Sequence, residues 1–226
     1  LPEVLPILPL TNTVLFPGVV IPINAGRDKS IKLINDANKS NKLIGVVSQK
    51  DIKNENPSIE DIYSVGTVAK ILRVLKMPDG NTTVIIQGKK RFKIKSVVKT
   101  DPYIQATISS LPDKNQRKSN NKFTATIDAI RDIALKIIKE NPNIPSEASF
   151  AIKNIHSSAF LINFVCSNMN ISVKDKQDLL SSLNIENKAL KCLKFLNVEH
   201  EKLALKNDIQ SKAVSYTHLR AHETSL

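Results

Sequence analysis

The residues that could bind a nucleotide lack the spacing that this chemistry needs. A P-loop requires two glycines five positions apart and then Lys-Ser or Lys-Thr, because backbone N–H groups, the amine and the hydroxyl together hold phosphate and Mg²⁺. The one Gly-Lys pair is Gly88-Lys89, but Lys90 follows it and Thr83 occupies the position of the first glycine. The sequence also has no Gly-x-Ser-x-Gly motif for a serine nucleophile. We therefore predict no catalytic residue and no bound cofactor in this chain.

The histidines offer only a weak metal-binding pattern. His218 and His222 are four residues apart and would share one helix face with Glu223, which is a spacing that can bind a metal ion. The segment that contains them differs in composition from the rest of the chain, so we do not assign a metal site there. His156 and His200 are isolated, and we expect surface or hydrogen-bonded structural roles for both.

The densest basic segment could contact phosphate groups. The chain has 33 basic and 21 acidic residues, a formal net charge of +12, which is compatible with nucleic-acid binding. Phosphate contacts along one strand would use Lys89, Lys90, Arg91, Lys93 and Lys95, with Lys99 beyond them. We favour the alternative that these side chains form the solvated face of an edge strand. Phe92 alternates with them toward the core, so no aromatic surface is available for stacking on bases.

Apolar residues at corners and turn tips are the other candidate binding group. A domain that recognises unfolded protein needs exposed, adaptable apolar surface. Full burial is difficult at such positions, and the candidates are Phe16, Pro17, Val19, Pro22, Met77 and Pro78. Each residue alone is better explained by core or turn packing, but as a group they are our predicted substrate-binding surface.

The first half of the chain must position these residues on strands. Prolines keep residues 5–18 extended with a corner at Pro17-Gly18, and residues 19–23 form a strand with Pro22 at an edge or bulge. A helical period follows over residues 27–40. Further strands are predicted at 43–49, 65–75, 82–87, 91–98 and 103–111, with Asp79-Gly80 in a hairpin turn and Gly88 interrupting the ladder. About six strands with hairpin connections predict an antiparallel, partly closed barrel over residues 1–112.

The second half is predicted to be helical. Residues 113–121 form a polar linker, and apolar periodicity indicates helices over residues 122–212. Ser172 with Asp175, and Asn184 before a long final helix, are predicted N-terminal caps. Residues 213–226 lose the Lys, Asn and Ile bias of the chain, so we expect a non-native tail after Lys212. The N-terminus has no basic signal-peptide region, and no apolar run has the length to span a membrane. Cys166 and Cys192 are predicted to be buried free thiols, and we expect a cytoplasmic protein.

Several motifs in a fixed order resemble one protein family. They are Pro9–Gly18 (Pro-Leu-x-x-x-Val-Leu-Phe-Pro-Gly), Gly66–Ile71, Pro78–Gly80, Gly88–Ile94 and Pro102-Tyr103. In this order they resemble the N-terminal domain of the Lon family of ATP-dependent proteases, although Thr11 stands where the family usually has a basic residue. The resemblance extends over residues 5–212, because the segment 175–180 and the long helix after it are also similar to the family's helical subdomain.

The resemblance implies a fold and a function. The fold would be α+β, a PUA-like pseudo-barrel followed by a helical bundle with a long final helix. The function would be recognition of unfolded or damaged proteins and their delivery to an AAA+ module and a serine protease domain. The AAA+ module would use ATP and Mg²⁺. Both of these domains would lie outside this chain, and the parent protein would be a homohexamer. From a different class, the alternative is a nucleic-acid-binding PUA-like module with weak DNA binding.

Overall fold

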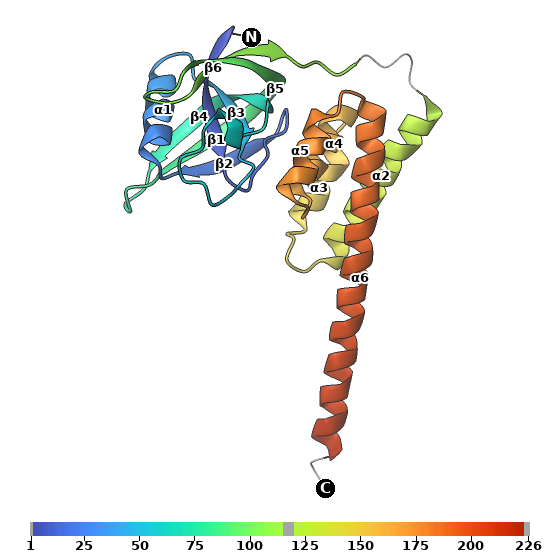
Figure 1. The fold of residues 1–226 in the computed structure, drawn as a ribbon. Coiled ribbons are helices and arrows are strands. Elements are labelled where there is room, and N and C mark those ends of the chain that lie inside the picture. The colour runs from blue at the N-terminus through green and yellow to red at the C-terminus, as the bar shows by residue number, and fades with distance from the viewer. Residues whose placement is uncertain (1, 115–119, 224–226) are drawn as a thin grey trace.

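A six-stranded sheet, five strands of which close into a ring, forms the N-terminal half of the chain in a computed structural model, which describes residues 2–114 and 120–223 (Figure 1). The strands are β1 (Val4–Leu10), β2 (Val20–Ala25), β3 (Leu43–Ser48), β4 (Val65–Lys76), β5 (Thr82–Lys99) and β6 (Gln105–Ser110), with α1 (Asp28–Lys39) between β2 and β3. Their order is β2-β5-β4-β3-β1-β6, and β6 also pairs with β5. This second pairing closes the ring, while β2 remains outside it as an edge strand.

The sheet is mixed, whereas the sequence predicted an antiparallel one. Strand β1 pairs in parallel with β3, with Ile7 opposite Gly45, and every other described strand pair is antiparallel. The reason is the connection between the two strands. The chain leaves β1, passes through β2 and α1, and returns in the same direction, which is the long crossover that a parallel pair requires. The predicted α+β pseudo-barrel is otherwise confirmed.

Gly88 lies inside the continuous strand β5. The β4–β5 ladder nevertheless changes register beside it, between Ala69 opposite Gly88 and Thr67 opposite Arg91, so the predicted interruption is a bulge and not a strand end. A Cβ atom at this position would lie 2.3 Å from the carbonyl oxygen of Phe16. The absent side chain lets the Pro17-Gly18 corner approach β5, where the Gly18 N–H donates to the Gly88 carbonyl at 2.9 Å and the Gly88 N–H donates to the Val19 carbonyl at 2.9 Å. Gly18 itself has a φ of 83°, which the predicted corner requires.

In the part of the chain that the structure describes, five helices follow the last strand. They are α2 (Asn121–Glu140), α3 (Glu147–Asn154), α4 (Ser158–Asn168), α5 (Val173–Ser181) and α6 (Ile185–Glu223). The Ser172 hydroxyl accepts from the Asp175 N–H at 3.0 Å, and the Asn184 side chain accepts from the Glu186 N–H at 2.8 Å. Both caps are where the sequence placed them. The long final helix is also confirmed, and it extends well beyond the other helices (Figure 1).

The helices pack against the ring through its Pro17 corner. Val14, Phe16 and Val19 belong to the same buried cluster as the apolar faces of α2 to α6, while separate clusters fill the ring. The Asn163 side chain donates to the Pro17 carbonyl at 3.1 Å, and the Gln177 side chain donates to the Val65 carbonyl at 2.8 Å. These contacts define the subdomain interface, a name used below for the surface between ring and helices. In the described part of the chain, no helix is both long and apolar enough to cross a membrane.

Candidate functional site

The strands β2, β5 and β4 share one face that points away from the interior of the ring. Residues that lie directly opposite each other on paired strands point to the same side of a sheet. Pro22 lies opposite Ile85, which lies opposite Arg73, and two residues further along Asn24, Thr83 and Leu75 form the next row. Ile21, Ile86 and Ile71 form the alternate row, in which Ile86 and Ile71 are buried. The register therefore assigns Val20, Pro22 and Leu75 to one surface, which we call the outer face.

Apolar side chains of this outer face are open to solvent. Val20 is 48% exposed, Leu75 is 37% exposed, and Met77 in the turn after β4 is 45% exposed. The turn is well defined, because the Met77 N–H donates to the Asn81 carbonyl at 2.9 Å and Gly80 has a φ of 85°. The surface is thus a partly apolar sheet face next to a hydrogen-bonded hairpin turn, with Lys70 and Arg73 on β4.

Only half of the predicted apolar candidates lie on this surface. Pro22, Met77 and Pro78 are exposed there, and Pro17 is half-buried. Phe16 and Val19 are 0% and 5% exposed, so the expectation that burial would be incomplete at these corners is wrong. The helices cover both residues, so the corner of the ring that contains them is part of the hydrophobic core that the ring shares with the helices.

The basic residues of β5 are likewise divided into exposed and buried side chains. Lys89, Lys90, Lys93 and Lys95 are exposed, but Arg91 is buried. The Arg91 guanidinium donates to the carbonyls of Leu180 and Ser182, both at 2.6 Å, and forms an ion pair with Asp113 at 2.6 Å. Arg91 is therefore unavailable for phosphate, contrary to its place in the predicted basic set. Phe92 is fully buried, as its alternation predicted.

The remaining candidate residues form no site among the described residues. His200 contacts Glu140 at 3.0 Å, and no cluster of three metal-ligating side chains occurs in the described part. The side chains of His218 and His222 lie outside the described residues. Cys166 and Cys192 are buried free thiols, as the sequence predicted.

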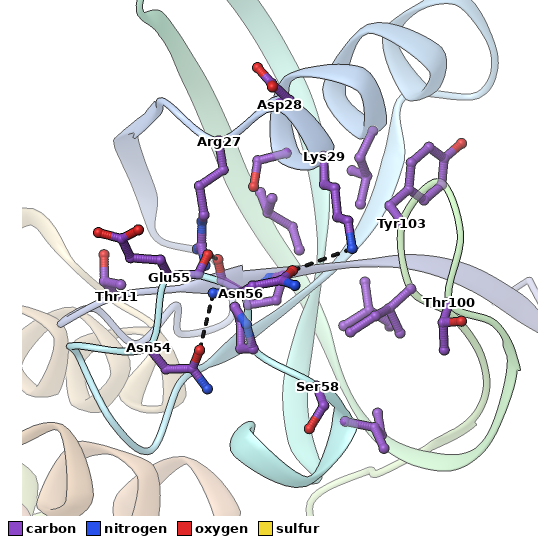
Figure 2. A pocket seen from close by; sticks show the side chains of 18 of the residues that line it. Thr11, Arg27, Asp28, Lys29, Asn54, Glu55, Asn56, Ser58, Thr100 and Tyr103 are labelled. Atoms are coloured by element: carbon purple, nitrogen blue, oxygen red, sulfur yellow. Dashed lines mark hydrogen bonds between the residues drawn. The ribbon is translucent and has the colours of Figure 1, made fainter.

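A cleft of about 830 Å³ lies beside the ring at the start of α1. Four segments that are distant in sequence form its wall, namely the second half of β1, residues 26–33, the loop 52–59 and the approach to β6 (Figure 2). Its base is closed by side chains that are at most 9% exposed, namely Ile7, Leu8, Leu33 and Ile104. The accessible apolar lining is formed by half-buried Pro9, Pro57, Ile59 and Tyr103. Ile52 at the edge is 57% exposed. No local motif marks this cleft in the sequence, because each segment contributes only a few unremarkable residues.

Two cations extend into the cleft from the beginning of α1. The Arg27 guanidinium donates to the Pro9 carbonyl at 3.1 Å and to the Glu55 carbonyl at 3.4 Å. The Lys29 amine donates to the Asn56 side-chain oxygen at 3.3 Å. Burial lowers the pKa of the Arg27 guanidinium, because the cation loses part of its hydration. The cleft therefore combines an apolar lining with donors that are directed at neutral oxygen atoms.

The fold and these two surfaces define a binding domain. An exposed sheet face and a cleft are both suited to holding a ligand. Residues 4–198 match the family described as the ATP-dependent protease La (LON) substrate-binding domain. The chain belongs to this family.

Individual relatives agree with this assignment. The chain is 63% identical over 212 residues to a Lon protease of Flavobacterium johnsoniae and 47% identical over 211 residues to one of Cytophaga hutchinsonii. These alignments cover 94% and 93% of this chain but 26% of each relative, so the chain spans about a quarter of their length. The solved N terminal domain of Mycobacterium avium complex Lon protease has the same fold, with a TM-score of 0.70 at 18% identity over 86% of this chain and 98% of that one.

Proposed function

We propose that this chain is the substrate-recognition part of a Lon-type ATP-dependent serine protease and that its outer face binds apolar segments of unfolded or damaged proteins. The observation behind this proposal is the register of β2, β5 and β4, which gathers Val20, Pro22 and Leu75 on one side next to Met77. Exposed apolar side chains on a rigid sheet would bind many sequences, because apolar contact does not depend on the direction or identity of the bound segment.

The catalytic steps would belong to other parts of the parent protein. Its AAA+ module would use ATP and Mg²⁺, its serine protease domain would cut the chain, and the subunits would assemble as a homohexamer in the cytoplasm. Helix α6 would connect the recognition domain to that machinery. This part of the proposal rests on the relatives, of which the chain spans only 26%.

A second candidate function is nucleic-acid binding by the exposed lysines of β5. Lys89, Lys90, Lys93 and Lys95 remain solvent-accessible, and the net charge of the chain is +12. Binding through phosphate contacts would weaken steeply with salt, because it is driven by release of counterions. Apolar capture has no such dependence, so the two functions are separable in one experiment.

The test is fluorescence anisotropy of a labelled, reduced and alkylated polypeptide titrated with the 226-residue chain at low and high salt. A labelled DNA duplex is titrated in parallel. Polypeptide binding that persists at high salt supports recognition of apolar segments. Binding of the duplex alone, with loss at high salt, would make the lysines of β5 the functional surface.

Variants then locate the binding surface. Val20→Asp combined with Met77→Asp places two charges on the outer face and should weaken polypeptide binding about tenfold, because apolar contacts are replaced by solvated carboxylates. Phe150→Asp combined with Leu205→Asp is the matched control, since these residues of α3 and α6 are 73% and 61% exposed but lie outside this face. Equal losses in both variants would contradict the assignment to the outer face.

A further inference from the structure

Arg27 is a half-buried cation without an anionic partner in the described part of the chain. Among residues 2–114 and 120–223 its guanidinium forms no ion pair, and its two hydrogen bonds go to backbone carbonyls. These bonds satisfy part of its donor capacity but do not compensate the charge. A carboxylate in the cleft would supply that compensation and would form the stronger, charge-assisted type of hydrogen bond.

Arg27 is the half-buried charge of the cleft, whereas Asp28, Lys29 and Glu55 in its lining are exposed. Figure 2 shows Arg27 directed into the cleft and Lys29 directed toward Asn56 across it. Neither Asp28 nor Glu55 forms an ion pair with Arg27 among the described residues. An anionic group that reaches Arg27 would therefore meet a guanidinium that the described residues leave without a carboxylate.

The apolar part of the cleft lies next to these cations. Its accessible apolar surface comes from half-buried residues of the lining and from the exposed Ile52 at the edge, and the half-buried ones are Pro9, Pro57, Ile59 and Tyr103. The volume of about 830 Å³ is in the range of sites that bind small ligands or short peptide segments. The ligand that fits both parts has an apolar body and one carboxylate close to it.

We propose that this cleft binds the C-terminal residue of a polypeptide that ends in apolar side chains, with its terminal carboxylate on Arg27 and its last side chains on the apolar lining. A C-terminal residue has the carboxylate on its backbone, so one residue can fill both parts of the cleft. An internal aspartate or glutamate uses its side chain for the carboxylate and leaves the apolar lining without a partner. The inference rests on the proposed function only in that the ligand is a polypeptide, and it assigns a second surface.

The test compares peptides that differ only at their last atoms. An N-terminally labelled peptide Gly-Ser-Gly-Ser-Ala-Ile-Leu is titrated with the 226-residue chain, once as the free acid and once as the C-terminal amide. We expect the free acid to bind about tenfold tighter, as a partly buried charge-assisted hydrogen bond would give. Equal affinity for both forms would overturn the proposal. So would equal binding of a C-terminally amidated peptide that has an internal glutamate.

Two variants attribute the preference to the cleft. Arg27→Gln should abolish the difference between acid and amide, and Lys153→Gln at an exposed position of α3 is the control with the same change of charge. Because Arg27 also supports two backbone carbonyls, Ile52→Asp provides a second variant at an exposed position. It should weaken binding of the free acid more than that of the amide, by repulsion. An unchanged preference in both cleft variants would contradict the proposal.

The outer-face variant separates this inference from the proposed function. Val20→Asp with Met77→Asp should weaken binding of the unfolded polypeptide and leave the acid-over-amide preference of the short peptide intact. Arg27→Gln should give the opposite pattern. If the outer-face variant also abolished the acid-over-amide preference, the cleft would not be an independent site.

Discussion

The subdomain interface and the cleft each contain an arginine that donates to backbone carbonyls, but only one of them has a carboxylate partner. Arg91 at the interface is 4% exposed, is bound by two carbonyls of the α5–α6 region, and pairs with Asp113 at 2.6 Å. Arg27 in the cleft has two carbonyl partners and no ion pair among the described residues. The comparison shows that the described residues supply a carboxylate to one arginine and none to the other.

The same contrast holds for apolar residues. Phe16 and Met77 were both predicted to lie at exposed corners, yet Phe16 is 0% exposed and Met77 is 45% exposed. The Lys188 amine lies 5.2 Å from the centre of the Phe16 ring and donates to the Asn163 side-chain oxygen. Packing of the helices therefore decides which apolar corner contributes to stability and which remains available for binding.

The largest expected effect is at Phe16. Phe16→Ala should lower the free energy of unfolding by roughly 3–5 kcal/mol, because it leaves a cavity in the buried cluster shared by ring and helices. Met77→Ala, at an exposed position, should change it by less than about 0.5 kcal/mol. Urea unfolding followed by circular dichroism measures both. A small loss for Phe16→Ala would mean that the ring and the helices do not share one core.

The two arginines test the comparison directly. Arg91→Gln should cost roughly 3 kcal/mol, because it leaves buried carbonyls and the Asp113 carboxylate without their partner. Arg27→Gln should cost only about 1 kcal/mol, because its bonds to carbonyls are longer and partly solvated. The midpoint of urea unfolding ranks the two variants. A reversed order would show that the cleft, and not the interface, depends on its arginine for stability.

Lys188 gives the interface a dependence on pH. The pKa of this amine is lowered from its ordinary value of 10.5, mainly because the amine is buried, and the neighbouring Arg91 lowers the pKa further. Cys166, Asp113 and Cys192 raise it, but by less than burial lowers it. Between the folded-state pKa and 10.5 the unfolded chain binds more protons than the folded chain. The free energy of unfolding should therefore rise with pH between these two pKa values. Below the folded-state pKa the amine is charged in both states, and the destabilisation from burying its charge is fully present.

The matching experiment compares the chain with Lys188→Met by urea unfolding between pH 7 and pH 10. The variant removes the titrating group, so its stability should rise less over this range than that of the unaltered chain. Parallel curves would show that Lys188 retains its ordinary pKa in the folded chain.

Local features of the fold were predictable from the sequence, and features that depend on distant segments were not. The caps at Ser172 and Asn184 and the corner at Gly18 depend on residues within a few positions. Arg91 donates to the carbonyl of Leu180, which is 89 residues away. The alternation of residues within β5 therefore does not indicate that the helices cover the outward-facing side of this strand at Arg91. The parallel β1–β3 pair and the four-segment cleft depend on the path of the whole chain for the same reason.

The smallest expected effect on stability is at Val20, where binding and folding should separate most clearly. Val20→Ser removes an apolar side chain that is 48% exposed on an edge strand, so the free energy of unfolding should change by less than about 0.5 kcal/mol. Binding of the unfolded polypeptide should still weaken about twofold to threefold, because part of the apolar contact area is lost. Parallel measurements by urea unfolding and anisotropy test both statements. A stability loss comparable to that of Phe16→Ala, with unchanged binding, would show that the outer face is a structural surface like the interface. Only a residue that makes few contacts within the folded chain can be altered without lowering the free energy of unfolding.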